Sequence, residues 1–220
     1  MKNWRTRLMI CVSLAETTAE KCFDALRGID FAEIRLDKMQ VGIEDVKKIF
    51  SHHPKLIATC RPGTMNDEIR ITLILTAIEA GAAFVDVEVE SDAQYKNAVL
   101  EKARSLGCRL IVSYHNFEKT PQKTKLEQII SQCFESGADV AKIACMIHSE
   151  KDNARLLGLL SEERPLVVVG LGEKGKISRI VAPFLGSAFT YASLSKGKET
   201  AIGQMDWKTL KQIIQVLKNV

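Results

Sequence analysis

The chain repeats one pattern. A short run of apolar and β-branched residues is followed by a polar loop, and then by a segment with apolar residues at three- and four-residue spacing. The first kind of run predicts a buried strand and the second an amphipathic helix. Strands are expected at residues 7–13, 32–36, 55–60, 84–89, 109–114, 139–145, 166–170 and 188–192. Helices are expected at residues 17–27, 43–50, 67–80, 92–106, 123–136, 150–161, 176–184 and 206–218.

Glycines mark four of the joints between a helix and the next strand, at Gly28, Gly81, Gly107 and Gly137. Glycine adopts a positive φ without steric cost, which suits the residue that ends a helix. Strict alternation of strands and helices predicts an α/β fold, a (β/α)8 TIM barrel forming one domain over residues 1–220. A doubly wound open sheet is the alternative architecture.

The composition is that of an ordinary soluble protein, with 46% apolar and 26% charged residues and a net charge of +4. Because the basic residues are spread along the chain, no nucleic-acid partner is expected. Residues 1–15 imitate a short signal peptide, but the apolar stretch is too short, and we interpret it as the first strand. No segment approaches the ~20 apolar residues of a membrane span, so no membrane partner is expected.

The six cysteines show neither a C-x-x-C motif nor a histidine spacing suited to zinc, and no metal site is predicted. Several of them lie within apolar strands. They are therefore expected to be buried free thiols, which indicates a reducing, cytoplasmic location.

Lys142 lies at the centre of the apolar run 138–146, and His115 follows the apolar residues of the run 110–117. An ammonium group among apolar side chains is desolvated, which lowers its pKa and leaves some neutral amine able to attack a carbonyl. The pair therefore indicates an imine-forming enzyme. Alternatively, the lysine extends its amine to solvent and the histidine is structural.

In a barrel, side chains at the carboxyl ends of all strands converge on one mouth. The polar residues at these positions are Ser13, Glu33, Arg35, Asp37, Thr59, Arg61, Asp86, Glu88, His115 and Lys142. Buried charges are costly unless paired, so this ring indicates a functional site or an internal salt-bridge cluster. Alternation predicts Glu33, Arg35 and Asp37 on one face of a strand. Asp86 and Glu88 are expected to support neighbours such as Lys142 and Arg35.

Four motifs occur in a fixed order: Glu33-Ile-Arg-Leu-Asp37, Thr59-Cys-Arg61, Ser113-Tyr-His-Asn-Phe117 and Lys142-Ile-Ala-Cys-Met146. With Ser178-Arg179, Gly186-Ser-Ala188 and Gly203-Gln204 near the end, the chain resembles the type I 3-dehydroquinate dehydratases almost end to end. The resemblance implies a homodimeric barrel enzyme without a cofactor. It implies removal of water from the small-molecule substrate 3-dehydroquinate, giving 3-dehydroshikimate in the shikimate pathway of aromatic amino acid biosynthesis.

The same resemblance assigns roles to residues of this chain. Lys142 resembles the Schiff-base lysine, and His115 resembles the general acid/base. Arg179 resembles the partner of the substrate carboxylate, a role that suits a planar guanidinium. The remaining substrate contacts fall on Ser13, Glu33, Arg35, Arg61, Thr200 and Gln204, of which Gln204 resembles the glutamine of a loop that closes over substrate.

The chain departs from the family pattern after Arg61, where many members read Arg-x-x-x-Glu-Gly-Gly and use that glutamate to orient the histidine. Met65 takes the glutamate position here. Asp67 or Glu68 is therefore expected to substitute from a differently shaped loop, or His115 lacks this partner. The pKa and tautomer of His115 depend on which is true.

Two further departures lie near the end of strands. Ile147 stands where the lysine motif usually continues Met-Pro, and only the path of the following loop is expected to change. In the segment 199–204, Thr200 keeps the hydroxyl of the usual serine but the usual proline is absent. Loss of that proline is expected to leave the loop less restricted before it closes.

Two other functions fit parts of the sequence. Class I aldolases also place an imine-forming lysine on strand 6 of a barrel, and the segment 170–176 with its three glycines offers either a phosphate site or a surface loop. A barrel that only binds a small acid or another protein would explain the arginines. It would not explain a lysine and a histidine at one mouth.

Overall fold

The computed structural model describes residues 8–161 and 163–219, in which parallel strands alternate with helices. The strands are β1 (Ile10–Leu14), β2 (Ala32–Arg35), β3 (Leu56–Thr59), β4 (Phe84–Glu88), β5 (Arg109–Asn116), β6 (Val140–Met146), β7 (Leu166–Leu171) and β8 (Thr190–Ser193). The α-helices are α1 (Ala19–Leu26), α2 (Ile43–His52), α3 (Asp67–Glu79), α4 (Ala93–Leu106), α5 (Lys123–Glu135), α6 (Glu150–Leu157), α7 (Lys176–Val181) and α8 (Trp207–Lys218). Three short 3-10 turns are η2 (Leu36–Lys38), η3 (Gly158–Ser161) and η4 (Glu173–Gly175).

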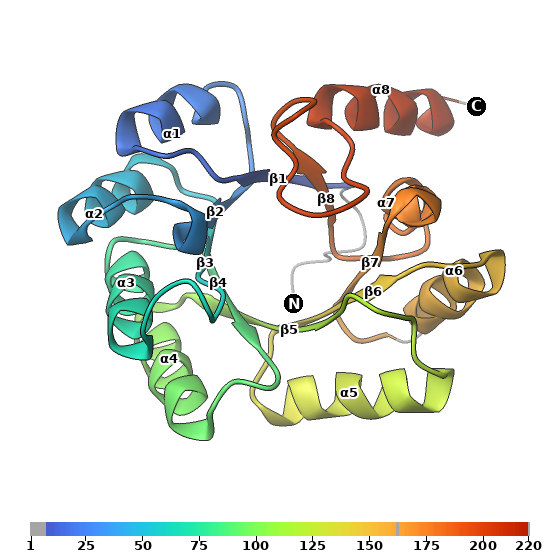
Figure 1. Cartoon of the computed structure of the whole chain (residues 1–220), viewed down its shortest axis with the longest axis horizontal. Helices are drawn as coiled ribbons and strands as arrows, with labels where there is room; N and C mark the ends of the chain where they lie inside the picture. The colour runs from blue at the N-terminus through green and yellow to red at the C-terminus, as the bar shows by residue number, and fades with distance from the viewer. Residues whose placement is uncertain (1–7, 162, 220) are drawn as a thin grey trace.

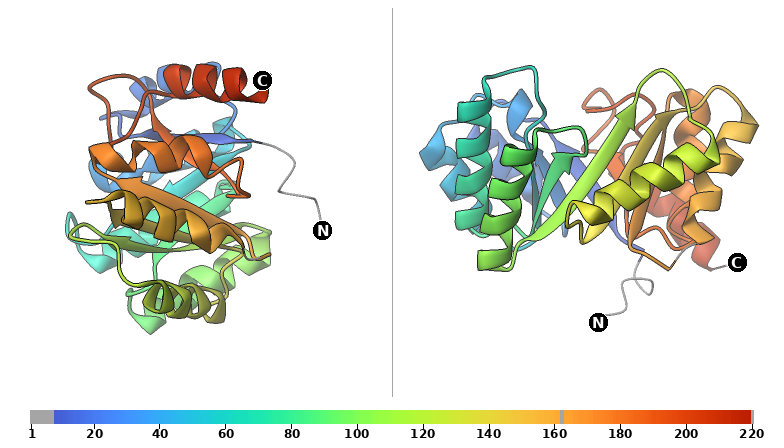
Figure 2. Two further views of the ribbon diagram at one scale, coloured as in Figure 1. Left: turned by 90° about the vertical axis from the view of Figure 1, so that its right-hand side faces the viewer. Right: turned by 90° about the horizontal axis from the view of Figure 1, so that it is seen from below.

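The strands form one sheet in the order β7-β6-β5-β4-β3-β2-β1-β8. The sheet curls until β7 and β8 meet, and beside this seam the backbone N–H of Ala188 donates to Leu166 O at 2.9 Å. Figure 1 shows the helices as a ring around the strands, and Figure 2 shows from the side how they flank the sheet. The expected TIM barrel is confirmed, and the doubly wound open sheet is wrong.

Local sequence signals account for the ends of the elements. The Asp92 carboxylate accepts from the backbone N–H groups of Gln94 and Tyr95 at the start of α4, and Gly107 ends this helix with φ at 71°. Asp92 satisfies amide groups that the first turn leaves without an intrahelical partner. Gly28, Gly81 and Gly137 also have positive φ, which confirms the predicted helix-to-strand joints.

Apolar side chains fill the barrel below its mouth. Phe31, Phe84 and Phe189 are buried there. The rings of Phe31 and Phe189 pack edge to face, with centroids 5.1 Å apart. Aromatic pairs favour this geometry. The polar residues at the strand ends therefore lie above a packed apolar core inside the barrel.

The structure bears on several expectations from composition. All six cysteines are free and buried, as predicted. Among the described residues, no helix is both long enough and apolar enough to cross a membrane. The first expected strand begins at Arg7, which lies outside the described residues; the strand is seen from Ile10.

Candidate active site

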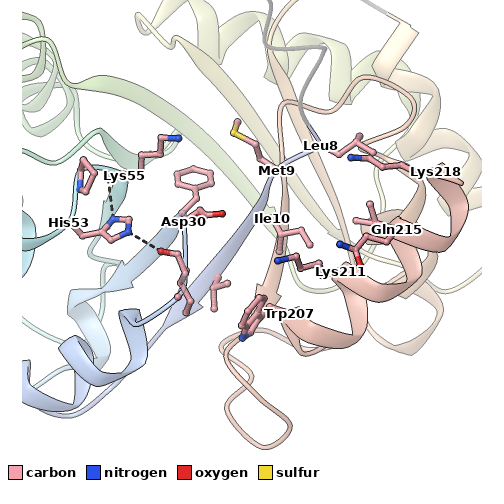
Figure 3. Close-up of a pocket in the computed structure, with 16 residues that line it drawn as sticks. Leu8, Met9, Ile10, Asp30, His53, Lys55, Trp207, Lys211, Gln215 and Lys218 are labelled. Atoms are coloured by element: carbon pink, nitrogen blue, oxygen red, sulfur yellow. Dashed lines mark hydrogen bonds between the residues drawn. The ribbon is translucent and has the colours of Figure 1, made fainter.

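Within the described residues, a cavity lies at each end of the barrel. The cavity at the amino-terminal end of the strands has a volume of about 450 Å³ and is drawn in Figure 3. Its histidine, His53, uses both ring nitrogens on the backbone: Nε2 lies 2.9 Å from Ile29 O, and Nδ1 accepts from Lys55 N at 3.2 Å. This histidine therefore fixes the chain between β1 and β3 and is not available for acid–base chemistry.

The cavity at the carboxyl ends of the strands has a volume of about 500 Å³. It is lined by most of the residues that the sequence singled out: Glu33, Arg35, Asp37, Arg61, Glu88, His115, Lys142, Arg179, Thr200 and Gln204. Strand-end side chains of a barrel point to this end. This cavity is the candidate active site.

Lys142 projects into the barrel from β6 and is only 5% exposed. Its Nζ lies 3.0 Å from Asp86 Oδ2 and 3.7 Å from Glu33 Oε1, and 4.2 Å above the ring of Tyr191. The amine therefore does not extend to bulk solvent. The alternative that the lysine extends to solvent is therefore wrong, and two carboxylates face the buried amine.

Glu33 on β2 is buried, and each of its carboxylate oxygens accepts one hydrogen bond. Ser13 Oγ donates to Glu33 Oε2 at 2.5 Å, and Thr59 Oγ1 donates to Glu33 Oε1 at 3.0 Å. Burial alone would raise the pKa of Glu33, but the nearby cations Lys142 and Arg35 outweigh it and the pKa lies below its ordinary value. Glu33 is thus an anion beside the Lys142 amine.

Arg61 holds the two carboxylates of β4 together. Its Nη1 lies 2.7 Å from Glu88 Oε1, and its Nη2 lies 2.9 Å from Asp86 Oδ2. Ser113 Oγ also lies 2.9 Å from Arg61 Nη1. Burial alone would raise the pKa of Asp86, but Arg61 and Lys142 lower it well below its ordinary value. Asp86 supports Lys142 as expected.

Arg35 does not take its support from β4, so that expectation was wrong. It binds Asp37 through two parallel bonds, with Nε 2.9 Å from Oδ1 and Nη2 2.7 Å from Oδ2. Asp37 lies in the turn η2 and not on the strand, so alternation along β2 does not place it. Arg35 also lines the cavity wall.

His115 lies near the end of β5 and has a carboxylate partner, Glu88. The distance from His115 Nδ1 to Glu88 Oε2 is 3.0 Å, and both side chains are 15% exposed. The expected substitution by Asp67 or Glu68 was wrong. His115 lacks a partner from the segment after Arg61, as the other alternative expected, and Glu88 of β4 contacts it instead. Asp67 instead pairs with Arg70 on α3, and Glu68 is exposed. Met65 packs its sulfur 3.7 Å from Cys60 Sγ.

Arg179 on α7 is a buried cation with unused donors. Its Nη1 donates to Tyr191 O at 3.4 Å, but Nε and Nη2 find no hydrogen-bond partner within the described residues. Burial lowers the pKa of Arg179 to about 10. A guanidinium in this condition is suited to an incoming anion, because a carboxylate can satisfy two of its donors at once.

The loop between β8 and α8 brings Thr200 and Gln204 to the site. Thr200 Oγ1 lies 2.8 Å from Ser13 Oγ, and Gln204 Oε1 accepts from Thr200 N at 2.7 Å. Gly203, with φ at 80°, packs its Cα against Gly172 beyond β7 so closely that a Cβ would collide with Gly172 O. Figure 1 shows this loop beside the ends of β1 and β8.

The segment 170–176, which was a candidate phosphate site, has its glycine amides occupied. Gly170 N donates to Ser178 Oγ, Gly172 N to Ile202 O and Gly175 N to Gly172 O. The glycines Gly170, Gly172 and Gly175 are buried, while Glu173 and Lys174 between them are exposed, so the segment lies at the surface with its glycines packed inward. A phosphate site at a glycine-rich turn requires free amide groups, and these three glycines offer none.

Sequence reasoning missed two aromatic residues of the cavity wall. Tyr191 lies beneath the Lys142 amine. Phe117 stacks on His115, with ring centroids 5.9 Å apart and ring planes inclined by 13°. Tyr191 looks like a core residue in an apolar strand. Its inward position in β8, opposite Cys11 of β1, is the signal that could have found it.

Comparisons with known proteins agree with one another. Residues 10–220 match the family model described as type I 3-dehydroquinase. A 3-dehydroquinate dehydratase from Methanocaldococcus jannaschii is 38% identical, over 95% of this chain and 99% of the relative.

Two solved structures share the fold along nearly the whole chain. A type I 3-dehydroquinate dehydratase from Clostridium difficile, solved with covalently modified comenic acid, has a TM-score of 0.85 and 26% identity, covering 97% of this chain and 94% of that one. The 3-dehydroquinate dehydratase from Aquifex aeolicus has a TM-score of 0.83 and 26% identity, covering 97% and 100%.

Proposed function

Because the chain belongs to the type I 3-dehydroquinase family, we propose that it removes water from 3-dehydroquinate, giving 3-dehydroshikimate, through an imine on Lys142 with His115 as general acid and base. The observation that carries this proposal is the position of the Lys142 amine. It is buried in the cavity that His115 and Arg179 also line. The site lies within the one barrel, which we propose as the single domain of the chain.

The first step joins the substrate ketone to Lys142. The neutral amine attacks the carbonyl carbon, and loss of one water leaves a C=N⁺ iminium on Nζ. Asp86 and Glu33, at 3.0 and 3.7 Å from Nζ, carry negative charge beside the cation that forms. Their negative charge stabilises the iminium once it has formed.

The second step uses the iminium as an electron sink. His115 removes a proton from the carbon next to the iminium carbon, and the C–H electrons form an enamine. The enamine then expels the β-hydroxyl, which takes a proton from the His115 imidazolium and leaves as water. Hydrolysis of the iminium consumes one water and frees Lys142. The net change is loss of one water from the substrate.

Substrate binding follows from the unused polar groups. Arg179 binds the ring carboxylate through Nε and Nη2, which lack partners within the described residues. Arg35, Thr200 and Gln204 line the cavity and contact the ring hydroxyls. Ser13 is buried outside the cavity lining and donates to Glu33, so this pair aligns the floor of the site. Arg61 is occupied by Asp86 and Glu88, so its role is to align these carboxylates.

The loop that carries Thr200 and Gln204 is the lid of this site. Its contacts to Ser13 and to Gly172 hold it over the cavity, and substrate must enter before these contacts form. A lid of this kind keeps bulk water from the imine. The substrate places the reaction in the shikimate pathway.

The proposed chemistry uses side chains alone and needs no cofactor. We further propose a homodimer in the cytoplasm, by likeness to the family. Sedimentation velocity of the purified protein checks the assembly; a single species with the mass of one chain would contradict the dimer.

One experiment tests the proposed function directly. The protein is incubated with 3-dehydroquinate and then with borohydride, which reduces an imine to a stable amine, and peptide masses locate the adduct. The ultraviolet absorbance of the conjugated enone follows product formation in parallel. We expect an adduct on Lys142 together with product. Product without an adduct would refute the imine mechanism. If neither product nor adduct formed, the proposed dehydratase activity itself would be refuted.

A further inference from the structure

The structure assigns to Glu88 the role of positioning His115, a role that the segment after Arg61 does not fill in this chain. The assignment rests on one contact, His115 Nδ1 to Glu88 Oε2 at 3.0 Å, and on the way Glu88 itself is fixed. The expected effect of Glu88 on turnover rests on the proposed function. The expected effect on which ring nitrogen of His115 carries the hydrogen is independent of the proposed function.

Glu88 is anchored from its other oxygen. Arg61 Nη1 lies 2.7 Å from Glu88 Oε1, so the two carboxylate oxygens have separate partners. Arg61 cannot move freely, because Asp86 binds both of its terminal nitrogens and Ser113 binds one. Glu88 therefore offers His115 an acceptor at a fixed place.

The pairing determines which ring nitrogen carries the proton. Burial alone would raise the pKa of Glu88, but Arg61 and the hydrogen bond from His115 lower it, so Glu88 is an anion and can only accept. In the neutral imidazole Nδ1 must therefore carry the hydrogen, and Nε2 keeps its lone pair. The Phe117 ring stacks on the imidazole with an interplanar angle of 13° and so restricts rotation of the imidazole away from Glu88. Nε2 is then the atom that takes the substrate proton.

The charges around His115 act in opposite directions. Burial lowers the pKa of His115, and the cations Arg61 and Lys142 lower it further. Glu88 raises it, through the hydrogen bond and through its charge. On β4, the charge of a protonated His115 also lowers the pKa of Asp86. Glu88 thus keeps the histidine basic enough to accept a proton at a site where other groups oppose it.

Acidic residues of the nearby segment do not compete for this role. Asp67 binds Arg70, and both Asp67 and Glu68 are exposed at the start of α3. They therefore provide matched controls. Substitution of either removes a carboxylate close in sequence to Arg61 but leaves the His115–Glu88 contact intact.

The first test reads the tautomer without any reaction. Ring nitrogens of the four histidines are labelled with ¹⁵N, and the His115 signals are identified by their loss in His115→Asn. At a pH above its pKa, we expect wild-type His115 to carry the hydrogen on Nδ1. In Glu88→Gln, whose amide can either accept or donate, we expect a mixture of tautomers or reversal. A wild-type ring with the hydrogen on Nε2 would overturn the assignment.

The second test measures turnover against pH for Glu88→Gln, Glu88→Asp, Asp67→Asn and Glu68→Gln. We expect Glu88→Gln to lower kcat/KM by about 10- to 100-fold, a part of what general acid–base catalysis supplies. The acid limb of its profile should move to lower pH, because the group that raises the histidine pKa is lost. Glu88→Asp keeps the charge and should recover part of the rate. Both controls should match the wild type.

The outcomes separate this proposal from the proposed function. A Glu88→Gln variant with the wild-type rate, pH profile and tautomer would refute the role of Glu88 even if the Lys142 adduct forms. Conversely, a fixed Nδ1–H tautomer that depends on Glu88 would support its positioning role even if 3-dehydroquinate proves not to be the substrate. If Glu88→Gln fails to fold, two measurements still test the role of Glu88. They are the tautomer of His115 in the wild type and the pH profile of turnover of Glu88→Asp.

Discussion

Lys142 Nζ and Asp86 Oδ2 lie 3.0 Å apart, although the residues belong to β6 and β4, on either side of β5. The contact crosses the interior of the barrel and joins residues 56 positions apart in the chain. With Arg61 and Glu88 it connects the amine proposed for imine formation to the carboxylate that holds His115. Both halves of the proposed chemistry therefore share one charge network.

Replacement of Lys142 by alanine should abolish the borohydride-dependent adduct and reduce turnover to background. No other group in the described cavity offers a buried primary amine. Intact-mass analysis after reduction with substrate checks this outcome. Lys119→Ala, at an exposed lysine of the β5–α5 loop, is the control and should retain both adduct and turnover. An adduct that persists in Lys142→Ala would refute the assignment.

His115→Ala should slow turnover by about 10²- to 10⁴-fold, the usual contribution of a general acid/base. A trapped adduct on Lys142 should still form, because the imine requires the amine. In the wild type, kcat/KM should rise with pH and level off below about 6.5, the ordinary histidine value, because burial lowers the pKa and the base must be neutral. An acid limb above that value would contradict the buried position of the base.

Asp86→Asn should destabilise the protein by about 3–5 kcal/mol near neutral pH, because it leaves the charges of Lys142 and Arg61 undercompensated. The folded-state pKa of Asp86 is depressed, so its contribution is fully present above the unfolded value of about 3.9 and is lost progressively as pH falls from there through the lower folded value.

Urea unfolding at several pH values checks both parts of this prediction. Wild-type stability should fall more steeply than that of Asp86→Asn between about pH 5 and about pH 2, so the two should converge in acid. Parallel curves would show that the Asp86 pKa does not differ between the folded and unfolded states.

Arg179→Met should weaken binding of a carboxylate-bearing substrate or analogue by about 2–5 kcal/mol. The same change should leave the free protein as stable or raise its stability by up to about 4 kcal/mol, because a buried cation with unused donors is replaced by an apolar side chain of similar length. Calorimetric binding and thermal unfolding without ligand measure the two effects. Lower stability with unchanged affinity would make Arg179 structural.

Gly203→Ala should impair closure of the lid, because its Cβ would collide with Gly172 O. Gly197→Ala in the same loop is the matched control: Gly197 has a similar positive φ of 84°, but a Cβ there would have no neighbour within 4 Å. Both variants carry backbone strain, but only Gly203→Ala adds the collision with Gly172. Gly203→Ala should therefore raise KM and lower kcat well beyond the control. Equal effects would show that strain alone matters.

Periodicity and turn residues predicted the secondary structure closely. The end of α4 at Gly107 and the start of β5 at Arg109 follow from signals within a few residues, whereas β5 runs to Asn116, two residues beyond the expected end. Motif order also found Lys142, His115 and Arg179. Tyr191 was missed, because an inward aromatic in an apolar strand has the same pattern whether it fills the core or lines a cavity.

By itself, the sequence determined the alternation of strands and helices, the barrel, and the candidate amine and imidazole, because each depends on local periodicity or on a motif in order. Only the tertiary structure decided that Glu88, and not Asp67 or Glu68, holds His115, and that Asp86 lies between Lys142 and Arg61. These pairings depend on the register of β3, β4, β5 and β6 and on the side chains that share the interior face. Strand register is set by packing of the whole barrel and is not encoded in any single segment.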